Sequence, residues 1–274
     1  MKQLVNDIQM NYEDVGNGPA LLLIHGFPLD HTLWTYQLES LRNEYRLVAP
    51  DLRGHGKSQA PPGPYRMEQM AKDLCDLIDL LKIERAVLVG LSMGGYIAFA
   101  FWRLYLHRVR ALVLADTRAA ADTPQGRQNR QEMAQRVQDQ GTSTVVEGML
   151  PKLLSPNTLQ NKPKVVAHAR RMMTNTPATG VIGALQGMAE RPDATLTLST
   201  ITVPTLIVVG ADDAITPPAE AEAMRETILS AHGEQLPGDK VHSVIIPDAG
   251  HLTPLENPPA FNQALREFLA SLPG

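Results

Sequence analysis

A serine flanked by glycines stands between an apolar strand pattern and an apolar helix pattern, and this turn constrains the fold more than any other part of the sequence. The run Gly90-Leu91-Ser92-Met93-Gly94-Gly95 follows the apolar residues 86–89 and precedes the apolar residues 96–102. A strand–serine–helix turn holds its serine in a strained conformation, and glycines leave space where a Cβ would meet the neighbouring elements. The hydroxyl then stands near a helix N-terminus, where backbone amides stabilise negative charge. Ser92 is therefore a candidate nucleophile that requires a base, an acid and oxyanion donors.

Short and nearly continuous apolar runs alternate with helical patterns along most of the 274 residues. Such continuous hydrophobicity is typical of parallel strands that are covered on both faces. The order predicts an α/β fold with a mostly parallel, doubly wound sheet, in which residues 1–15 form edge strands. The predicted strands are 20–24, 46–49, 87–89, 111–114, 205–209 and 244–246, and the predicted helices are 33–43, 67–82, 93–107, 217–230 and 257–271.

Residues 119–200 interrupt this alternation, because they contain helix-like stretches and no strong strand run. We predict that they form a helical lid (cap) domain inserted late in the chain, while residues 1–118 and 201–274 form the core. The predicted lid helices are 124–140, 142–154, 161–174 and 178–190. This segment has no Phe, Tyr or Trp, and we expect most of its aliphatic and methionine side chains to pack the lid while some face a substrate. The predicted substrate-binding residues are Phe27, Met149, Leu153, Met172, Met188 and Leu252.

Composition excludes several classes of function. The formal net charge of −4 provides no basic field for nucleic acid, and a single cysteine, Cys75, allows no intramolecular disulfide. No apolar run approaches the length of a membrane span, and the first residues lack a signal-peptide pattern. No paired Cys/His spacing indicates a metal site. We therefore expect a soluble, cytoplasmic monomer or small homo-oligomer with no cofactor, no metal, and no membrane or nucleic-acid partner.

The loops that follow the predicted strands contain the other groups that a serine nucleophile needs. Ligands in open α/β sheets bind at the carboxyl ends of the strands, so chemistry is expected in these loops. The base is His251, which follows the last strand. The acid is Asp213, with Asp212 and Asp116 as alternatives, because all three lie beyond the end of a strand.

These residues predict an acyl-transfer mechanism. His251 would accept the Ser92 proton as the serine oxygen attacks a carbonyl carbon, and the aspartate would orient the imidazole. The resulting oxyanion would be bound by the backbone N–H groups of Met93 and Phe27, since Gly26 allows a close approach before Phe27.

The chain resembles an α/β-hydrolase-fold serine hydrolase of the carboxylesterase, 3-oxoadipate enol-lactonase and cofactor-free haloperoxidase branch. The motifs that carry the resemblance run in order along nearly the whole chain: HGFPLD at 25–30, DLRGHGKS at 51–58, GLSMGGY at 90–96, GADDAITPP at 210–218 and DAGHLTPLENP at 248–258. The resemblance implies that Asp213 is the acid and that 119–200 is the lid. It also implies loop-stabilising roles for four further residues, His25, Arg53, His55 and Glu256.

The expected function is hydrolysis of carboxylic esters with small to medium acyl groups through an acyl-enzyme intermediate. The aliphatic lid favours neutral esters, and its lack of tryptophan weighs against an enol-lactone site. The alternatives are a lactonase or 3-oxoadipate enol-lactonase and a perhydrolase or haloperoxidase-type side activity. A non-catalytic small-molecule receptor on the same scaffold is a further alternative. Residues 231–240 are predicted to form a surface loop with no assigned function.

Overall fold

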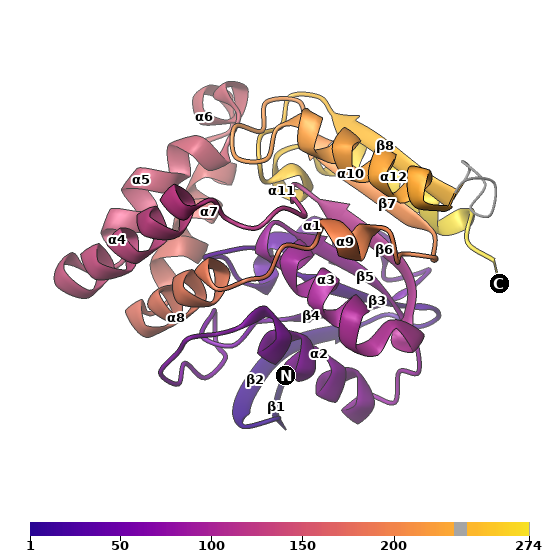
Figure 1. Cartoon of the computed structure of the whole chain (residues 1–274), viewed down its shortest axis with the longest axis horizontal. Coiled ribbons are helices and arrows are strands. Elements are labelled where there is room, and N and C mark those ends of the chain that lie inside the picture. The colour runs from indigo at the N-terminus through magenta and orange to yellow at the C-terminus, as the bar shows by residue number, and fades with distance from the viewer. Residues whose placement is uncertain (233–239, 274) are drawn as a thin grey trace.

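Eight strands form one sheet in the order β1-β2-β4-β3-β5-β6-β7-β8 (Figure 1). The computed structural model describes residues 1–232 and 240–273. Strands β3 to β8 are mutually parallel, while β2 is antiparallel to both β1 and β4. The predicted mostly parallel sheet is confirmed, and residues 1–15 form two strands at one side of it, of which the first is the edge strand. The strands are β1 (Lys2–Val5), β2 (Ile8–Val15), β3 (Ala20–Ile24), β4 (Arg46–Pro50), β5 (Ala86–Leu91), β6 (Val109–Ala115), β7 (Thr205–Gly210) and β8 (Val241–Ile246).

The register of the parallel strands brings their carboxyl ends to one edge of the sheet. Leu91 at the end of β5 pairs with Ala115 at the end of β6, and Ala115 pairs with Val208. Gly210 at the end of β7 pairs with Ile246 at the end of β8. The loops that follow these strands therefore begin side by side, although they lie far apart in the sequence.

Helices cover both faces of the sheet. The connection from β3 to β4 runs toward the β1 edge of the sheet, whereas the later connections run toward the β8 edge. Right-handed crossovers therefore place α1 on the opposite face from α2, α3 and α10. α2 packs against α3, while α1 packs against α12, so each face has its own helix layer. The core helices are α1 (Thr35–Leu41), α2 (Met67–Leu80), α3 (Met93–Tyr105), α10 (Pro218–His232), α11 (Thr253–Glu256) and α12 (Pro258–Ala270), with 3₁₀ turns η1 (His31–Trp34) and η2 (Leu106–Arg108).

The chain between β6 and β7 is helical and gathers beside one end of the sheet (Figure 1). The short α6 has no counterpart among the predicted helices, because six residues are too few to show a periodic pattern. Ser155 caps it and Pro156 begins it. The helices are α4 (Pro124–Gln140), α5 (Ser143–Leu153), α6 (Pro156–Asn161), α7 (Pro163–Asn175), α8 (Ala178–Ala189) and α9 (Thr195–Leu198).

Some other boundaries differ from the predicted ones. β8 begins at Val241, three residues before the predicted strand, because this edge strand includes the polar His242 and Ser243 and so lacks a continuous apolar signal. In the segment predicted as a loop, Ala231 and His232 belong to α10, and residues 233–239 lie outside the described residues. None of the helices in the described ranges combines the length and the apolar character that a bilayer crossing requires.

Helix α8 docks on the core through a face of glycines. Gly180, Gly183 and Gly187 share one side of the helix, as their spacing requires. A Cβ at Gly180 would lie 1.7 Å from the carbonyl oxygen of Gly54, and one at Gly187 would lie 1.7 Å from that of Tyr65. The backbone of α8 therefore lies directly against the core loop that contains Gly54 and Tyr65.

We expect Gly187→Ala to lower the free energy of unfolding by about 1–3 kcal/mol, because the new methyl group overlaps a backbone carbonyl that cannot rotate away. Urea unfolding followed by circular dichroism measures the change. Gly148→Ala is the matched control, since a Cβ at this helical position meets nothing within 4 Å. That variant should gain about 0.5–1 kcal/mol. Equal effects at the two positions would contradict backbone docking of α8.

Candidate active site

Ser92 occupies a strained turn between β5 and α3. Its φ of 54° and ψ of −113° lie in a region that residues with a side chain rarely adopt. Glycines make the turn possible, because a Cβ at Gly90 would lie 2.5 Å from the carbonyl oxygen of Gly94, and one at Gly94 would lie 2.2 Å from that of Ile24. Ser92 directly follows the last residue of β5, at the carboxyl edge of the sheet, and its side chain is half-buried.

The structure brings Ser92, His251 and Asp213 into one hydrogen-bonded chain. The Ser92 hydroxyl lies 2.8 Å from His251 Nε2, and His251 Nδ1 lies 2.7 Å from Asp213 Oδ2. His251 is 2% exposed and Asp213 3% exposed, so both groups are shielded from water. If Nδ1–H donates to the aspartate, Nε2 is free to accept the serine proton. This is the geometry in which a serine hydroxyl can be activated.

The Asp213 carboxylate is held by donors from its own loop. Oδ1 accepts hydrogen bonds from the amides of Ile215 and Thr216 at 2.8 and 3.0 Å, and the Thr216 hydroxyl donates to Oδ2 at 2.8 Å. Burial raises the pKa of Asp213, but the hydrogen bonds and charge of His251, together with Thr216, outweigh burial and lower it. The aspartate is therefore ionised at neutral pH. The supporting role of Thr216 is not among the sequence predictions. The pattern Asp-x-x-Thr before a proline-initiated helix is a local signal that could have indicated it.

The two alternative acids lie elsewhere. Asp212 is exposed to solvent, and its backbone amide donates to the carbonyl of Ala249 at 2.9 Å. Asp116 is fully buried, but its carboxyl contacts the Gly210 amide and the Thr253 hydroxyl. The hydrogen bond to His251 is made by Asp213.

The two predicted oxyanion donors lie next to Ser92. Met93 is the first residue of α3, so its N–H has no partner within the helix. A Cβ at Gly26 would lie 3.2 Å from the Ser92 Cβ and 2.9 Å from the Leu91 side chain, so the loop that carries Phe27 packs directly on the serine turn. The positions of Met93 and Phe27 are consistent with the predicted oxyanion role, which stays a prediction.

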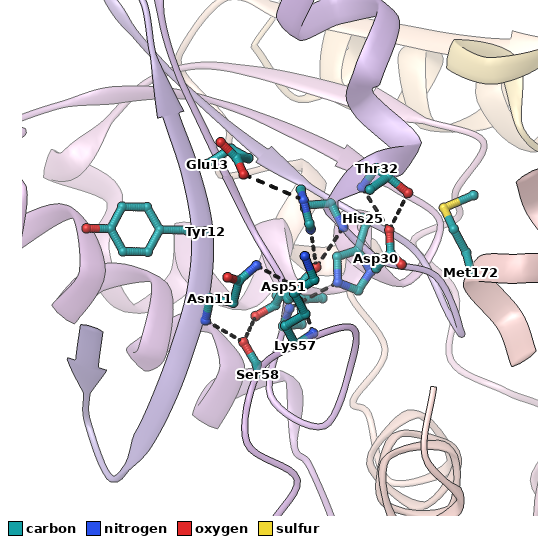
Figure 2. Close-up of polar contacts among 12 residues, drawn as sticks. Asn11, Tyr12, Glu13, His25, Asp30, Thr32, Asp51, Lys57, Ser58 and Met172 are labelled. Atoms are coloured by element: carbon teal, nitrogen blue, oxygen red, sulfur yellow. Dashed lines mark hydrogen bonds and ion pairs between the residues drawn. The ribbon is translucent and has the colours of Figure 1, made fainter. Parts of the chain in front are cut away.

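The loop after β3 is supported by Asp51, which receives donors from three segments (Figure 2). Asp51 Oδ1 accepts hydrogen bonds from the His31 amide at 2.8 Å and from His31 Nδ1 at 2.6 Å. Oδ2 accepts from Asn11 Nδ2 at 2.9 Å and from the Lys57 amide at 2.8 Å. Burial raises the pKa of Asp51, but the hydrogen bonds and the His31 charge outweigh burial and lower it to about 2.

Two buried histidines support the same loop in their neutral forms. The Leu52 amide donates to His25 Nε2 at 3.0 Å, so Nδ1 carries the proton and donates to the Gly26 carbonyl at 2.8 Å. Burial lowers the pKa of His25 and lowers that of His55 to about 3. The His55 ring meets the Phe27 ring edge-on at 6.4 Å between centroids. Both contacts are consistent with the predicted loop-stabilising roles.

In the described part of the chain, one group of side chains could bring three metal-ligand atoms within 4.8 Å of one another. It consists of Asp30, His31 and Asp51. However, each oxygen of Asp51 already accepts two hydrogen bonds, and Asp30 Oδ1 accepts from the amide and hydroxyl of Thr32. A cation would have to displace these donors. We therefore interpret the cluster as hydrogen-bonded support for the loop that carries Phe27.

The turn that carries His251 is held by Glu256 and by the end of α5. Glu256 Oε1 accepts from the amides of Gly250 and Leu252, while Oε2 accepts from the Ser155 amide at 2.7 Å. The His251 amide donates to the Leu153 carbonyl at 2.9 Å. The other predicted supporting residue, Arg53, is 2% exposed and pairs with Asp73 at 2.8 Å and with Asp7 at 2.6 Å.

A cavity of about 310 Å³ lies between the Phe27 loop and helices α4, α5 and α8. Of the six predicted substrate-binding residues, Phe27 and Met149 line it. Leu153, Met172, Met188 and Leu252 are at most 2% exposed and lie outside its lining, so their binding role stays a prediction. Two cations that the sequence analysis did not single out also line the cavity, Arg118 and Arg130. The complete lining is Phe27, Arg118, Ala121, Asp122, Thr123, Gly126, Asn129, Arg130, Met133, Met149 and Leu185.

Comparisons with known proteins agree with this architecture. A family model described as alpha/beta hydrolase fold matches residues 19–258. A thermophilic esterase from Thermogutta terrifontis has a structure with a TM-score of 0.93 and 45% identity, covering 99% of this chain and 98% of that one. The enol-lactonase from Burkholderia xenovorans LB400 gives a TM-score of 0.89 and 27% identity over 99% of this chain and 100% of that one. The 3-oxoadipate enol-lactonase 2 of Acinetobacter baylyi is 29% identical, covering 96% of this chain and 94% of its own. The predicted α/β-hydrolase fold and branch are confirmed.

The His31–Asp51 contact predicts a pH-dependent stability. Burial lowers the pKa of His31, but Asp51, Asp30 and Glu13 outweigh burial and raise it. Its stabilising contribution is therefore complete below the unfolded value of about 6.5 and is lost as the pH rises through the higher folded value. We expect the difference in unfolding free energy between the wild type and His31→Asn, which keeps a donor but does not titrate, to be larger at pH 5.5 than at pH 9. Urea unfolding at both pH values measures it, and a difference that grows with pH would refute the assignment.

Proposed function

Because the chain belongs to the alpha/beta hydrolase fold family, we propose that it is a serine-dependent carboxylic ester hydrolase that acts on small to medium acyl esters. The observation that carries the proposal is the continuous hydrogen-bonded chain from Ser92 through His251 to Asp213. The esterase with 45% identity supports the same activity. The proposed substrate is a small molecule, and the proposed reaction needs no cofactor.

The mechanism begins with proton transfer. His251 Nε2 removes the proton of Ser92 as the serine oxygen attacks the ester carbonyl carbon, and ionised Asp213 stabilises the imidazolium that forms. The tetrahedral intermediate collapses to an acyl-enzyme as His251 returns the proton to the departing alcohol. Water then attacks the acyl group with His251 as the base. The carboxylic acid is released and the Ser92 hydroxyl is restored.

The proposed oxyanion donors are the amides of Phe27 and Met93. They belong to buried residues beside Ser92, in a site where fixed dipoles interact more strongly with charge than they do in water. One such donor typically contributes about 2.7–4 kcal/mol to stabilising the transition state. The hydrogen bonds that fix the Phe27 loop on Asp51 and His25 would keep the donor in position before the substrate arrives.

Residues 119–200 are proposed to form the lid that selects the substrate. The cavity beneath α4 and α5 has the size for a small acyl or alcohol group, and Met133, Met149 and Leu185 give it an aliphatic side. These side chains favour short and medium aliphatic groups over long ones, because the cavity has a volume of about 310 Å³.

A second candidate is hydrolysis of a lactone or enol-lactone that bears a carboxylate. The cations Arg118 and Arg130 line the cavity together with one acid, Asp122, which leaves an excess of positive charge. Arg118 Nη2 donates to the Ile215 carbonyl at 2.7 Å, while Nη1 lies 3.9 Å from Glu220 Oε1. The two enol-lactonase relatives support this candidate, and so does the esterase structure described as malate-bound, since malate carries two carboxylates.

Ser92→Ala tests the proposed nucleophile. We expect p-nitrophenyl ester hydrolysis to fall by more than about 10⁴-fold, because the variant has no oxygen to form the acyl-enzyme. A serine-directed phosphonate should add one label to the wild type, located at Ser92 by mass spectrometry. Ser199→Ala, which changes an exposed serine, is the matched control and should retain full activity and labelling. A folded Ser92→Ala variant that keeps a tenth of the activity would exclude the mechanism, and absent labelling of the wild type would favour a receptor.

A substrate panel separates the two candidate functions. Rates on p-nitrophenyl acetate to decanoate should peak at short or medium chains, and a steady rise toward long chains would refute the size assignment. The panel adds lactones, peracid formation and a p-nitrophenyl ester with a terminal carboxylate.

If the carboxylate binds Arg118, Arg118→Gln should raise KM for that ester about tenfold and leave the neutral esters unaffected. Arg136→Gln, which changes an exposed cation of α4 outside the cavity lining, serves as the control. Equal KM changes for charged and neutral esters would rule out a carboxylate site.

A further inference from the structure

The four residues that end β6 and follow it, Ala115–Arg118, contact the loops of all three proposed catalytic residues. The Ser92 amide donates to the Ala115 carbonyl at 2.9 Å, and the Thr117 hydroxyl donates to the Ser92 carbonyl at 2.8 Å. The Thr117 side chain also fills the space that Gly95 leaves open, since a Cβ there would lie 2.4 Å from the Thr117 hydroxyl. This side of the segment therefore holds the serine turn.

The other side of the segment holds the loops of Asp213 and His251. The Asp116 amide donates to the Val208 carbonyl at 2.8 Å, and Asp116 Oδ1 accepts the Gly210 amide at 2.9 Å. Asp116 Oδ2 shares a hydrogen bond with the hydroxyl of Thr253, which lies two residues after His251. The Gly210 carbonyl in turn accepts a hydrogen bond from the Asp213 amide at 3.2 Å.

We propose that Asp116 is a positioning residue for the catalytic triad, whose carboxyl joins the loop that carries Asp213 to the turn that carries His251. The proposal rests on the proposed ester hydrolase function. Asp116 is fully buried, and its φ of 47° lies in the left-handed region, which aspartate tolerates better than most residues with a side chain. The strained backbone and the two side-chain contacts together fix the spacing between the strand ends of β6 and β7 and the start of α11.

The charge state of Asp116 follows from its surroundings. Burial, and then repulsion from Asp213, raise the pKa of Asp116 well above that of an exposed aspartate, and Glu256 adds to this repulsion. The hydrogen bonds from Thr253 and Gly210 oppose the shift without cancelling it. The raised pKa favours the neutral form of Asp116, whereas the lowered pKa of Asp213 favours its carboxylate form. A neutral carboxyl also matches the shape and hydrogen-bonding pattern of an asparagine amide.

Three variants test this role in the full-length protein with an ester that the wild type hydrolyses. Thr253→Val removes the hydroxyl but leaves Asp116 in place, and Asp116→Ala removes the carboxyl. We expect each to lower kcat about 10- to 100-fold with KM unchanged within about twofold, since small displacements of catalytic groups reduce the rate without weakening substrate binding. Asp116→Asn should retain at least a third of wild-type kcat, because its amide can donate to Thr253 while its oxygen accepts the Gly210 amide.

The pH profile distinguishes positioning from a charge effect. The acid limb of kcat/KM reports the protonation of an essential basic group in the free enzyme. The midpoint should be the same in the wild type and in Asp116→Asn. A downward shift would show that Asp116 is ionised and would overturn the proposed neutral form.

Controls keep the proposal separate from folding and from the proposed function. Thr253→Ser keeps the hydroxyl and should restore kcat, while Asp212→Ala removes an exposed aspartate from the neighbouring loop and should leave kcat unchanged. Circular dichroism and Tm establish that each variant is folded. Wild-type kcat in Thr253→Val, or a folded Asp116→Asn as impaired as Asp116→Ala, would overturn the positioning role. Absence of esterase activity in the wild type would instead overturn the proposed function.

Discussion

The parallel register of β5, β6, β7 and β8 is the constraint on which the rest of the site depends. It sets the starting points of three loops side by side, and the loops then need only a few residues to bring Ser92, His251 and Asp213 together. A shift of one strand by one residue would turn its last side chain to the other face of the sheet. The hydrogen-bonded chain of the site is thus a consequence of sheet pairing that is established far from the chemistry.

Buried carboxyl groups connect these loops to one another. Asp51 and Asp213 each accept two backbone amides, and such bonds help a carboxylate to stay ionised inside a protein. Glu256 accepts three amides and connects the turn of His251 to the residue that follows α5 and Leu154. Asp116 accepts one backbone amide, and burial and the charge of Asp213 raise its pKa. Asp51 and Asp213, with two amide donors each, have lowered pKa values, whereas Asp116 has a raised pKa.

The sequence predicts the sheet, the serine turn and the order of the catalytic residues, because continuous apolar runs and glycine-flanked turns are local signals. It does not by itself choose among Asp116, Asp212 and Asp213, since all three follow strand ends and only the three-dimensional turn directs one carboxylate to His251. The side chains of the predicted lid that line a cavity are still harder to predict from the sequence. Helical spacing marks Met149 and Met172 alike as apolar-face residues, but whether the face meets a cavity or another helix depends on how the helices pack.

The glycine face of α8 and the contacts at the end of α5 together limit how the helices of residues 119–200 can move. The backbone of α8 packs on the loop of Gly54 and Tyr65. At the end of α5, the Leu153 carbonyl accepts the His251 amide, and the Ser155 amide donates to Glu256. These helices cannot lift away as a hinged flap without removing hydrogen bonds from the turn that holds the imidazole. The position of His251 is therefore coupled through these hydrogen bonds to the packing of the helices of residues 119–200.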